Sequence, residues 1–297
     1  MYNLRRNCIS IIGSKNQIIF CDSDSVHKAA VEQQAVKAIT HGLENDEFQL
    51  FLQFIVDNKT KKIVSAEALS RWAHPANGIL PPGQYIPVME RNGIINKLDY
   101  YMFDKVCDLL QRWKDTDFSH ISISCNFTRI TLSDDNFIEK IASIAEKYSF
   151  DKSHLVIEIT EDAVEKNVET AVENVKHLKN MGYKVALDNL GSGYTALANL
   201  CEYPIDTVKL DRNILLKCDT ESGSQLFRGI VALAHSLKLG VVCEGVETIE
   251  QHDFVSSTEC DRIQGWFFSK AEPLSECEKF IISYNQKHKY LIQTKEG

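Results

Sequence analysis

Seven short apolar runs in this chain each end on a polar residue, and helix-like stretches separate most of them. The polar residues are Glu67, Asn126, Glu158, Asp188, Lys209, Glu244 and Gln264. An earlier run, Phe48 to Val56, carries Gln53 and brings the number of expected strands to eight. When parallel strands close into a barrel, apolar side chains fill its interior, so residues that do chemistry lie at the carboxyl ends of the strands. The pattern therefore predicts a parallel barrel with one site at its mouth.

The stretches between these runs have apolar residues three or four positions apart, which is typical of amphipathic helices. They span residues 96–113, 136–148, 161–181, 225–237 and 274–284. A TIM-like (β/α)8 barrel needs roughly 250 residues, and the chain has 297. We therefore expect one α/β barrel domain at residues 29–290, preceded by an N-terminal extension (1–28) and followed by a tail (291–297).

Composition and charge limit the possible partners and the location. No segment offers the ~18 uncharged apolar residues of a membrane span, and Met1 to Arg6 is not followed by the apolar stretch of a secretory signal. A cytoplasmic protein is expected. The net charge of −8 argues against a nucleic-acid polymer as partner. The nine cysteines show no CxxC spacing, which favours buried reduced thiols over disulfides or zinc.

Acidic side chains gather at the predicted mouth, where Glu67, Glu158, Glu161, Asp188 and Glu244 would converge. Carboxylates that lie close together repel one another unless protons or a bound cation neutralise them. With oxygen ligands from these carboxylates and from an amide, the expected cation is hard, either Mg²⁺ or Mn²⁺.

Several blocks at these positions resemble the EAL domain family, whose members are cyclic di-GMP phosphodiesterases. The segment Ser65 to Trp72 contains the Glu-Ala-Leu signature with its trailing arginine. Further matches are Asn126-Phe127-Thr128, Glu158-Ile159-Thr160-Glu161, Val208-Lys209-Leu210-Asp211-Arg212, Glu244-Gly245-Val246-Glu247-Thr248 and Gln264-Gly265-Trp266. Because the blocks occur in order and at strand-end spacing, they carry more weight than a three-letter motif.

The resemblance implies hydrolysis of cyclic di-GMP to linear pGpG by metal-activated water. It assigns Glu67, Asn126, Glu158 and Asp188 to a first metal ion, and Asp188 with position 189 to a second. The implied catalytic residues are Lys209, which orients the water or stabilises developing charge, Glu244, which holds the lysine, and Glu67.

The remaining roles implied by the resemblance concern the substrate and one loop. Arg71 would grip a phosphate, Gln53 and Leu69 would line the dinucleotide groove, and Gln264 would complete the polar ring. Glu161 would fix the loop after Asp188. A homodimer is also expected from the resemblance.

Some of these residues have simpler alternative interpretations. Asn126 could cap the following segment, and Glu161 could be an ordinary acid in the first turn of a helix. Lys209 could form a Schiff base with a carbonyl substrate, but such a lysine needs a depressed pKa, whereas surrounding carboxylates would keep it charged.

Two features bear on whether the chain is an active enzyme on its own. Active relatives read Asp-Asp-Phe-Gly where this chain reads Asp188-Asn189-Leu190-Gly191, so the second metal would lose a charged ligand. The alternative to a phosphodiesterase is therefore a cyclic di-GMP receptor or protein-interaction module without catalysis. Residues 1–20 also loosely resemble the end of a GGDEF domain, with a linker at Asp22–Ser25; an ordinary leader is the alternative.

Overall fold

The computed structural model describes residues 8–10, 19–21, 23–160, 168–191 and 204–293. Eight strands form the barrel, and their order around it is β3-β11-β10-β9-β8-β7-β6-β4, with β4 paired again to β3. The predicted closed barrel of eight strands is thus confirmed. The barrel strands are β3 (Phe48–Asp57), β4 (Ile63–His74), β6 (Ser122–Phe127), β7 (Leu155–Thr160), β8 (Lys184–Leu190), β9 (Thr207–Leu210), β10 (Gly240–Cys243) and β11 (Arg262–Gln264).

One strand runs against the others, so the prediction that all strands are parallel was wrong for β3. This strand pairs antiparallel with β4 and with β11, while the remaining barrel pairs are parallel. Only residues 58–62 connect β3 to β4. A parallel connection needs a crossover of a dozen or more residues, so a link this short makes a hairpin. Two short strands, β5 (Gly78–Leu80) and β12 (Glu272–Pro273), extend the sheet beside β4 and β3.

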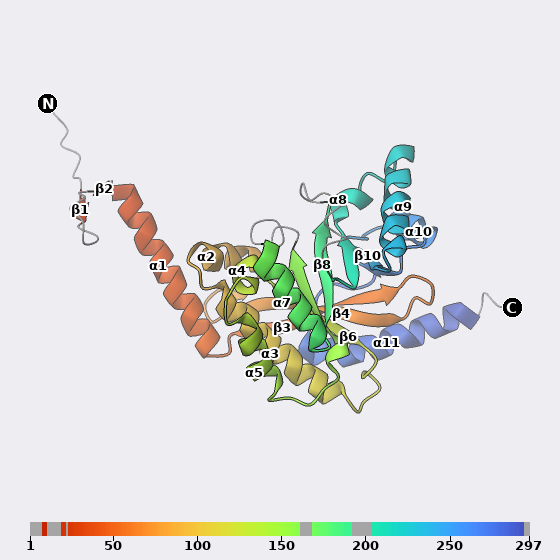
Figure 1. The fold of residues 1–297 in the computed structure, drawn as a ribbon, viewed down its shortest axis with the longest axis horizontal. Helices are drawn as coiled ribbons and strands as arrows, with labels where there is room; N and C mark the ends of the chain where they lie inside the picture. Colours follow the sequence, from red (N-terminus) through yellow and green to blue (C-terminus); the bar gives the residue numbers. More distant parts are fainter. Residues whose placement is uncertain (1–7, 11–18, 22, 161–167, 192–203, 294–297) are drawn as a thin grey trace.

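Helices surround the barrel, and α1 extends from it toward the N-terminus (Figure 1). The helices are α1 (Ser23–Glu44), α2 (Ile86–Arg91), α3 (Ile95–Trp113), α4 (Arg129–Leu132), α5 (Phe137–Ala145), α7 (Val168–Asn180), α8 (Arg212–Leu215), α9 (Glu221–Ser236), α10 (Ile249–Ser256) and α11 (Leu274–Gln293). Two 3₁₀ turns, η1 (Pro82–Gln84) and η2 (Lys152–His154), and an antiparallel pair, β1 (Cys8–Ser10) with β2 (Ile19–Cys21), complete the described elements.

The helix predictions were confirmed in place, with shifted ends. Helix α1 begins at Ser23, so the predicted linker at Asp22–Ser25 is largely the first turn of a helix. Helix α11 continues to Gln293, past its expected end at residue 284. Of the helix expected at residues 161–181, the first seven residues lie outside the described part of the chain.

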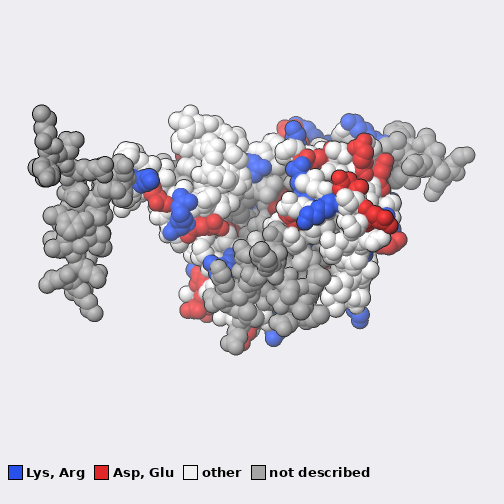
Figure 2. Space-filling model, turned by 90° about the horizontal axis from the view of Figure 1, so that it is seen from above, with Lys and Arg blue, Asp and Glu red and all other residues white. Residues whose placement is uncertain are grey.

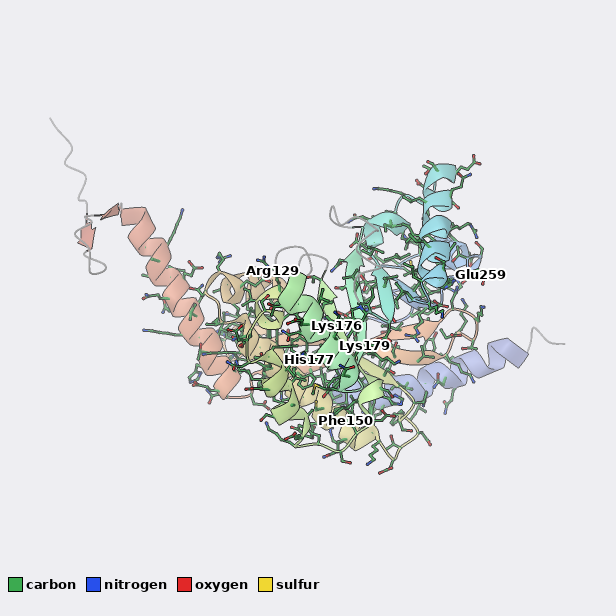
Figure 3. The ribbon with its side chains drawn as sticks, viewed as in Figure 1. Arg129, Phe150, Lys176, His177, Lys179 and Glu259 are labelled. Carbon is green, nitrogen blue, oxygen red and sulfur yellow. The ribbon has the colours of Figure 1, made fainter. Side chains whose placement is uncertain are left out.

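Helix α7 illustrates how the sequence pattern places helices on the barrel. Its apolar residues Ala171, Val175 and Leu178 are buried in the hydrophobic core. Lys176 and His177 are exposed and project from the outer face of the helix (Figure 3). The spacing of three and four residues thus sets which side of the helix faces the strands.

The described part of the chain also bears on the expected thiols and membrane segments. Its six characterised cysteines are free, and five of them are buried, as expected for reduced thiols. Within the described residues, no helix is both long and apolar enough to cross a membrane.

Candidate active site

The polar residues that follow the apolar runs meet at one end of the barrel. Asn126, Glu158, Asp188, Lys209 and Gln264 lie within the last three residues of their strands, and Glu244 follows β10 directly. Glu67 was wrongly expected at a strand end. It lies in the middle of β4, because β4 continues past the barrel to His74 as part of a hairpin with β3.

Lys209 lies at the centre of the site. Its Nζ is 2.7 Å from Glu244 Oε1, 2.9 Å from Glu158 Oε2, 3.0 Å from Glu67 Oε2 and 3.5 Å from Asp188 Oδ1. The lysine is 1% exposed and Glu158 is 2% exposed. An ammonium group has three protons, so it can donate to three of these carboxylates at once. The fourth, Asp188, is accordingly the most distant.

The site holds more acids than one lysine can neutralise. Burial raises the pKa of Glu158 well above its usual range and raises that of Asp188, with Lys209 opposing both shifts. Burial likewise raises the pKa of Glu244 to about 7. Burial lowers the pKa of Lys209, but the four carboxylates more than reverse this and hold it well above its usual value. Lys209 therefore stays charged, which contradicts the depressed pKa that a Schiff-base lysine needs.

Glu67 is the best-bonded acid of the site. Asn126 Nδ2 donates to its Oε1 at 2.8 Å, and Gln264 Nε2 donates to its Oε2 at 2.7 Å. Burial alone would raise the pKa of Glu67, but Lys209 and these amides hold it below its usual value. Gln264 Nε2 also lies 3.3 Å from Gln53 Oε1, which links β11 to β3. The N-cap of α4 is Thr128, so the side chain of Asn126 serves the acidic cluster and does not cap this helix.

A buried aspartate supports the segment that follows Asn126, and the sequence analysis missed it. Asp99 on α3 accepts hydrogen bonds at its Oδ2 from Thr128 N (3.0 Å), Thr128 Oγ1 (2.8 Å) and Thr131 Oγ1 (2.5 Å). Burial raises the pKa of Asp99 to about 6. Its position in an amphipathic helix gave no sign of this role.

Asn189 faces Asp188 through its amide nitrogen. Asn189 Nδ2 donates to Asp188 Oδ2 at 2.8 Å, and the residue has a φ of 60°. This left-handed conformation is one that asparagine tolerates better than most residues. The side chain thus hydrogen-bonds one of the aspartate oxygens that an adjacent cation would use.

The donor chemistry of the site suits a hard cation, although its present arrangement centres on the lysine. Asp188 Oδ1 and Gln264 Oε1 are buried and accept no hydrogen bond from the described residues. Oxygen donors of this kind are those that Mg²⁺ and Mn²⁺ prefer. No group of three or more His, Cys, Asp or Glu side chains in the described ranges is arranged around a vacant metal position. The Lys209 ammonium lies where the carboxylates converge.

A pocket of about 380 Å³ opens above this cluster. Gln53 and Leu69, the residues expected in the groove, line it, and so do Gln264 and the predicted metal ligands Glu67, Asp188 and Asn189. Trp266, which is 62% exposed, and Arg212 also line it and were not among the predicted site residues. Both belong to motif blocks, so their neighbours in sequence offered a signal.

Asn126, Glu158 and Lys209 belong to the cluster and not to the pocket lining, and the described part of the structure places two further predicted site residues in neither. Arg71 lies two residues beyond Leu69 on β4, where its Nη1 donates to the Ser70 carbonyl and its guanidinium lies over the Phe51 ring. Glu161 lies outside the described residues.

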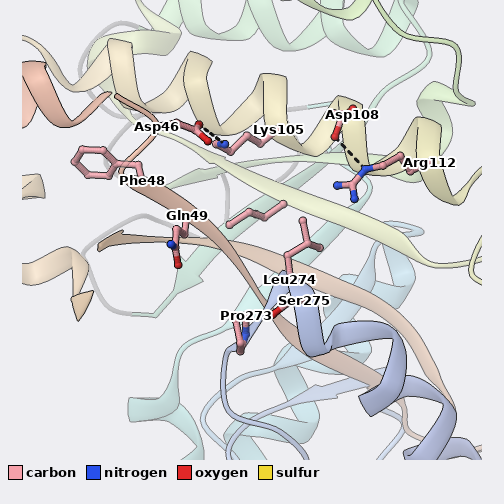
Figure 4. A pocket seen from close by; sticks show the side chains of 10 residues that line it. Asp46, Phe48, Gln49, Lys105, Asp108, Arg112, Pro273, Leu274 and Ser275 are labelled. Atoms are coloured by element: carbon pink, nitrogen blue, oxygen red, sulfur yellow. Dashed lines mark hydrogen bonds and ion pairs between the residues drawn. The ribbon is translucent and has the colours of Figure 1, made fainter. Parts of the chain in front are cut away.

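Another pocket, of about 350 Å³, lies outside the barrel between α3, β3 and the start of α11 (Figure 4). Its charged side chains are paired, Lys105 with Asp46 at 2.7 Å and Arg112 with Asp108 at 3.0 Å. Seen from above, basic and acidic side chains are mixed over the described surface (Figure 2).

The family model described as "EAL domain" matches residues 36–271. The chain therefore belongs to the EAL domain family. The cyclic di-GMP phosphodiesterases NbdA and RocR of Pseudomonas aeruginosa are 28% and 32% identical to it, over 91% and 85% of this chain. The chain spans 35% of NbdA and 64% of RocR, so it matches only part of each relative.

Solved structures support the same assignment. The chain is similar to a MucR phosphodiesterase in complex with cyclic di-GMP, with a TM-score of 0.77 and 27% identity over 82% of this chain and 99% of that one. It is also similar to an EAL domain protein of Listeria monocytogenes, with a TM-score of 0.71 and 28% identity over 82% of this chain and 96% of that one.

Proposed function

We propose that this chain hydrolyses one phosphodiester bond of cyclic di-GMP to give linear pGpG. The observation that carries the proposal is the set of four carboxylates, from Glu67, Glu158, Asp188 and Glu244, around the buried Lys209. A protein that only binds the nucleotide has no physical need for so costly a cluster of buried charges. The relatives named as phosphodiesterases support the substrate class.

In this proposal Glu67, Asn126, Glu158 and Asp188 would hold a first Mg²⁺ or Mn²⁺, and Asp188 with Asn189 would hold a second. Bound divalent ions lower the pKa of the attacking water and stabilise charge on the phosphate oxygens. Lys209, which the surrounding carboxylates keep charged, would donate a hydrogen bond to the water or to the phosphate. Glu244, at 2.7 Å, restrains the lysine.

The groove residues have separate tasks in binding. Gln53, Leu69 and Gln264 line the pocket, and Arg71 would leave its place over the Phe51 ring to bind a phosphate. The exposed Trp266 offers an aromatic face on which a guanine can stack, a contact worth ~1–3 kcal/mol per base. Glu161 fixes the loop after Asp188 in this proposal.

One observation favours a second function, a cyclic di-GMP receptor without turnover. Asn189 replaces a charged ligand and donates a hydrogen bond to Asp188, which competes with a second ion. In that case the fold and pocket would serve recognition alone. A cytoplasmic homodimer, possession of a GGDEF remnant in residues 1–20 and the domain limits 29–290 remain further proposals.

Hydrolysis of cyclic di-GMP across a titration of Mg²⁺ and of Mn²⁺ separates the two functions. Wild type is compared with Glu67→Ala, which lacks the best-bonded acid, and with Asn189→Asp, which restores the charge. Turnover by wild type that disappears in Glu67→Ala supports the enzyme. Tight cyclic di-GMP binding with no turnover at any metal concentration refutes the enzyme and supports the receptor.

A further inference from the structure

The pocket above the acidic cluster presents an electrostatic problem for its proposed ligand. Five carboxylates line it, from Glu67, Asp188, Asp211, Glu244 and Glu247. The buried ammonium of Lys209 lies beneath them and is not part of the described lining. Cyclic di-GMP carries two phosphates and thus two negative charges. A cation at the rim would offset the repulsion between these carboxylates and the phosphates.

Arg212 is the cationic side chain that the described lining provides. Its side chain is 48% exposed, and its Nη2 donates to Glu247 Oε2 at 2.6 Å. The guanidinium is therefore held in place by one carboxylate yet remains accessible to a ligand. A guanidinium presents five donors in a planar fork, so it can bind a phosphate while one donor stays on Glu247.

The backbone beside Arg212 leaves room for the aliphatic carbons of its side chain. Gly245, which follows the cluster residue Glu244, has a φ of +69°. A Cβ atom at this position would lie 2.6 Å from Arg212 Cγ, closer than atoms can pack. The glycine thus leaves the space in which the aliphatic part of Arg212 packs, and the arginine lines the pocket from there.

The barrel order places Arg212 opposite the arginine that the sequence analysis assigned to a phosphate. Arg212 follows β9, and Arg71 is on β4, four strands away in either direction around the eight-stranded barrel. The two phosphates of a cyclic dinucleotide lie on opposite sides of its ring. The strands that carry or precede the two arginines match this symmetry.

We propose that Arg212 is a substrate-binding residue that contacts the phosphate of cyclic di-GMP opposite the one reached by Arg71. This inference rests on the proposed function for its ligand, but it concerns binding and applies to an enzyme and to a receptor alike. Arg212 shares its guanidinium between Glu247 and the phosphate, and it leaves the chemistry of the cluster to other residues.

The test is equilibrium binding of cyclic di-GMP by calorimetry in EDTA, together with initial rates in Mg²⁺ or Mn²⁺. Arg212→Ala is expected to weaken binding at least tenfold and to raise KM similarly with kcat retained, and Arg212→Lys to lose about threefold. The matched control is Arg112→Ala, which removes an arginine that is 52% exposed, is paired with Asp108 at 3.0 Å and lines the pocket outside the barrel (Figure 4). The control is expected to bind within twofold of wild type.

A further variant separates a phosphate contact from a structural ion pair. Glu247→Gln frees the guanidinium, so binding should be retained or tighter if Arg212 contacts phosphate. If Glu247→Gln weakened cyclic di-GMP binding as much as Arg212→Ala, the ion pair between Arg212 and Glu247 would have a structural role only, and the inference would be overturned. Binding by Arg212→Ala within twofold of wild type would also overturn it while leaving the proposed function intact. If wild type neither binds nor hydrolyses cyclic di-GMP, both proposals fail.

Discussion

Removing the central cation is expected to destabilise the fold far more than removing any one acid around it. The variant Lys209→Met keeps most of the volume of the side chain but leaves four carboxylates without their cation. At the 2.9 Å separation from Glu158, Coulomb attraction amounts to ~6 kcal/mol at an effective dielectric constant of about 20. The desolvation of the buried ammonium offsets much of this, so the expected net loss is ~3–5 kcal/mol.

Glu158→Gln is the matched variant, because it removes one charge from the same buried cluster. Lys209 would keep Glu67, Asp188 and Glu244 as partners and lose one of four competing acids. A change of less than about 1 kcal/mol, in either direction, is expected, since removal of a surplus buried charge relieves desolvation and repulsion.

Urea unfolding followed by circular dichroism, in EDTA and then in Mn²⁺, measures both variants. In EDTA, Lys209→Met should be at least ~2 kcal/mol less stable than Glu158→Gln, because the lysine is the one cation that contacts all four carboxylates whereas Glu158 is one of four acids. Mn²⁺ should stabilise Lys209→Met more than wild type, because a divalent cation can replace the missing charge. Equal stability of the two variants, or a loss below ~1 kcal/mol in Lys209→Met, would refute the reasoning.

Three further predictions concern the metal, the outer packing and a buried acid. Asn189→Asp should lower the Mg²⁺ or Mn²⁺ concentration for half-maximal hydrolysis about tenfold, since the added charge attracts the ion by ~1 kcal/mol or more; an unchanged midpoint in a rate titration contradicts this. Phe54→Ala should cost ~3–5 kcal/mol in urea unfolding, because this fully buried ring stacks on Phe280 with centroids 5.0 Å apart; a loss below ~1 kcal/mol contradicts it. Asp99 has a folded-state pKa of about 6, raised above its unfolded value near 3.8, so wild type should lose stability between about pH 4 and 6 as this group ionises. Asp99→Asn should not show this loss of stability. Urea unfolding of both proteins across this pH range measures it, and free energies of unfolding that fall in parallel would contradict the assignment.

The barrel and its acidic centre could be predicted because one local pattern determines both. An apolar run followed by a polar residue marks the mouth end of a parallel strand, and this is why Glu158 and Lys209 were expected near each other although 51 residues separate them. The direction of β3 could not be read in this way. Its run has the composition of a strand in either direction, and only the short connection to β4 holds the information.

The residues at the rim were harder to predict than those at the floor. Arg212 follows a motif lysine, but its place in the pocket depends on the space at Gly245 and on Glu247, which are distant in sequence. Asp99 contacts the segment after Asn126 from a different helix. Such contacts arise when helices pack on the barrel, and no local periodicity encodes them.

The reversed strand β3 also has a consequence for the order in which the barrel can assemble. Its contact with β4 is formed between neighbours in sequence, whereas its contact with β11 joins Ile55 to Gln264 across most of the domain. Pairings of such long separation form late, because the entropy of closing the loop is lost before any contact is gained. We therefore expect the seam between β3 and β11 to be the last part of the barrel to form and the first to open, which ties the positions of Gln53 and Gln264 in the site to the final step of folding.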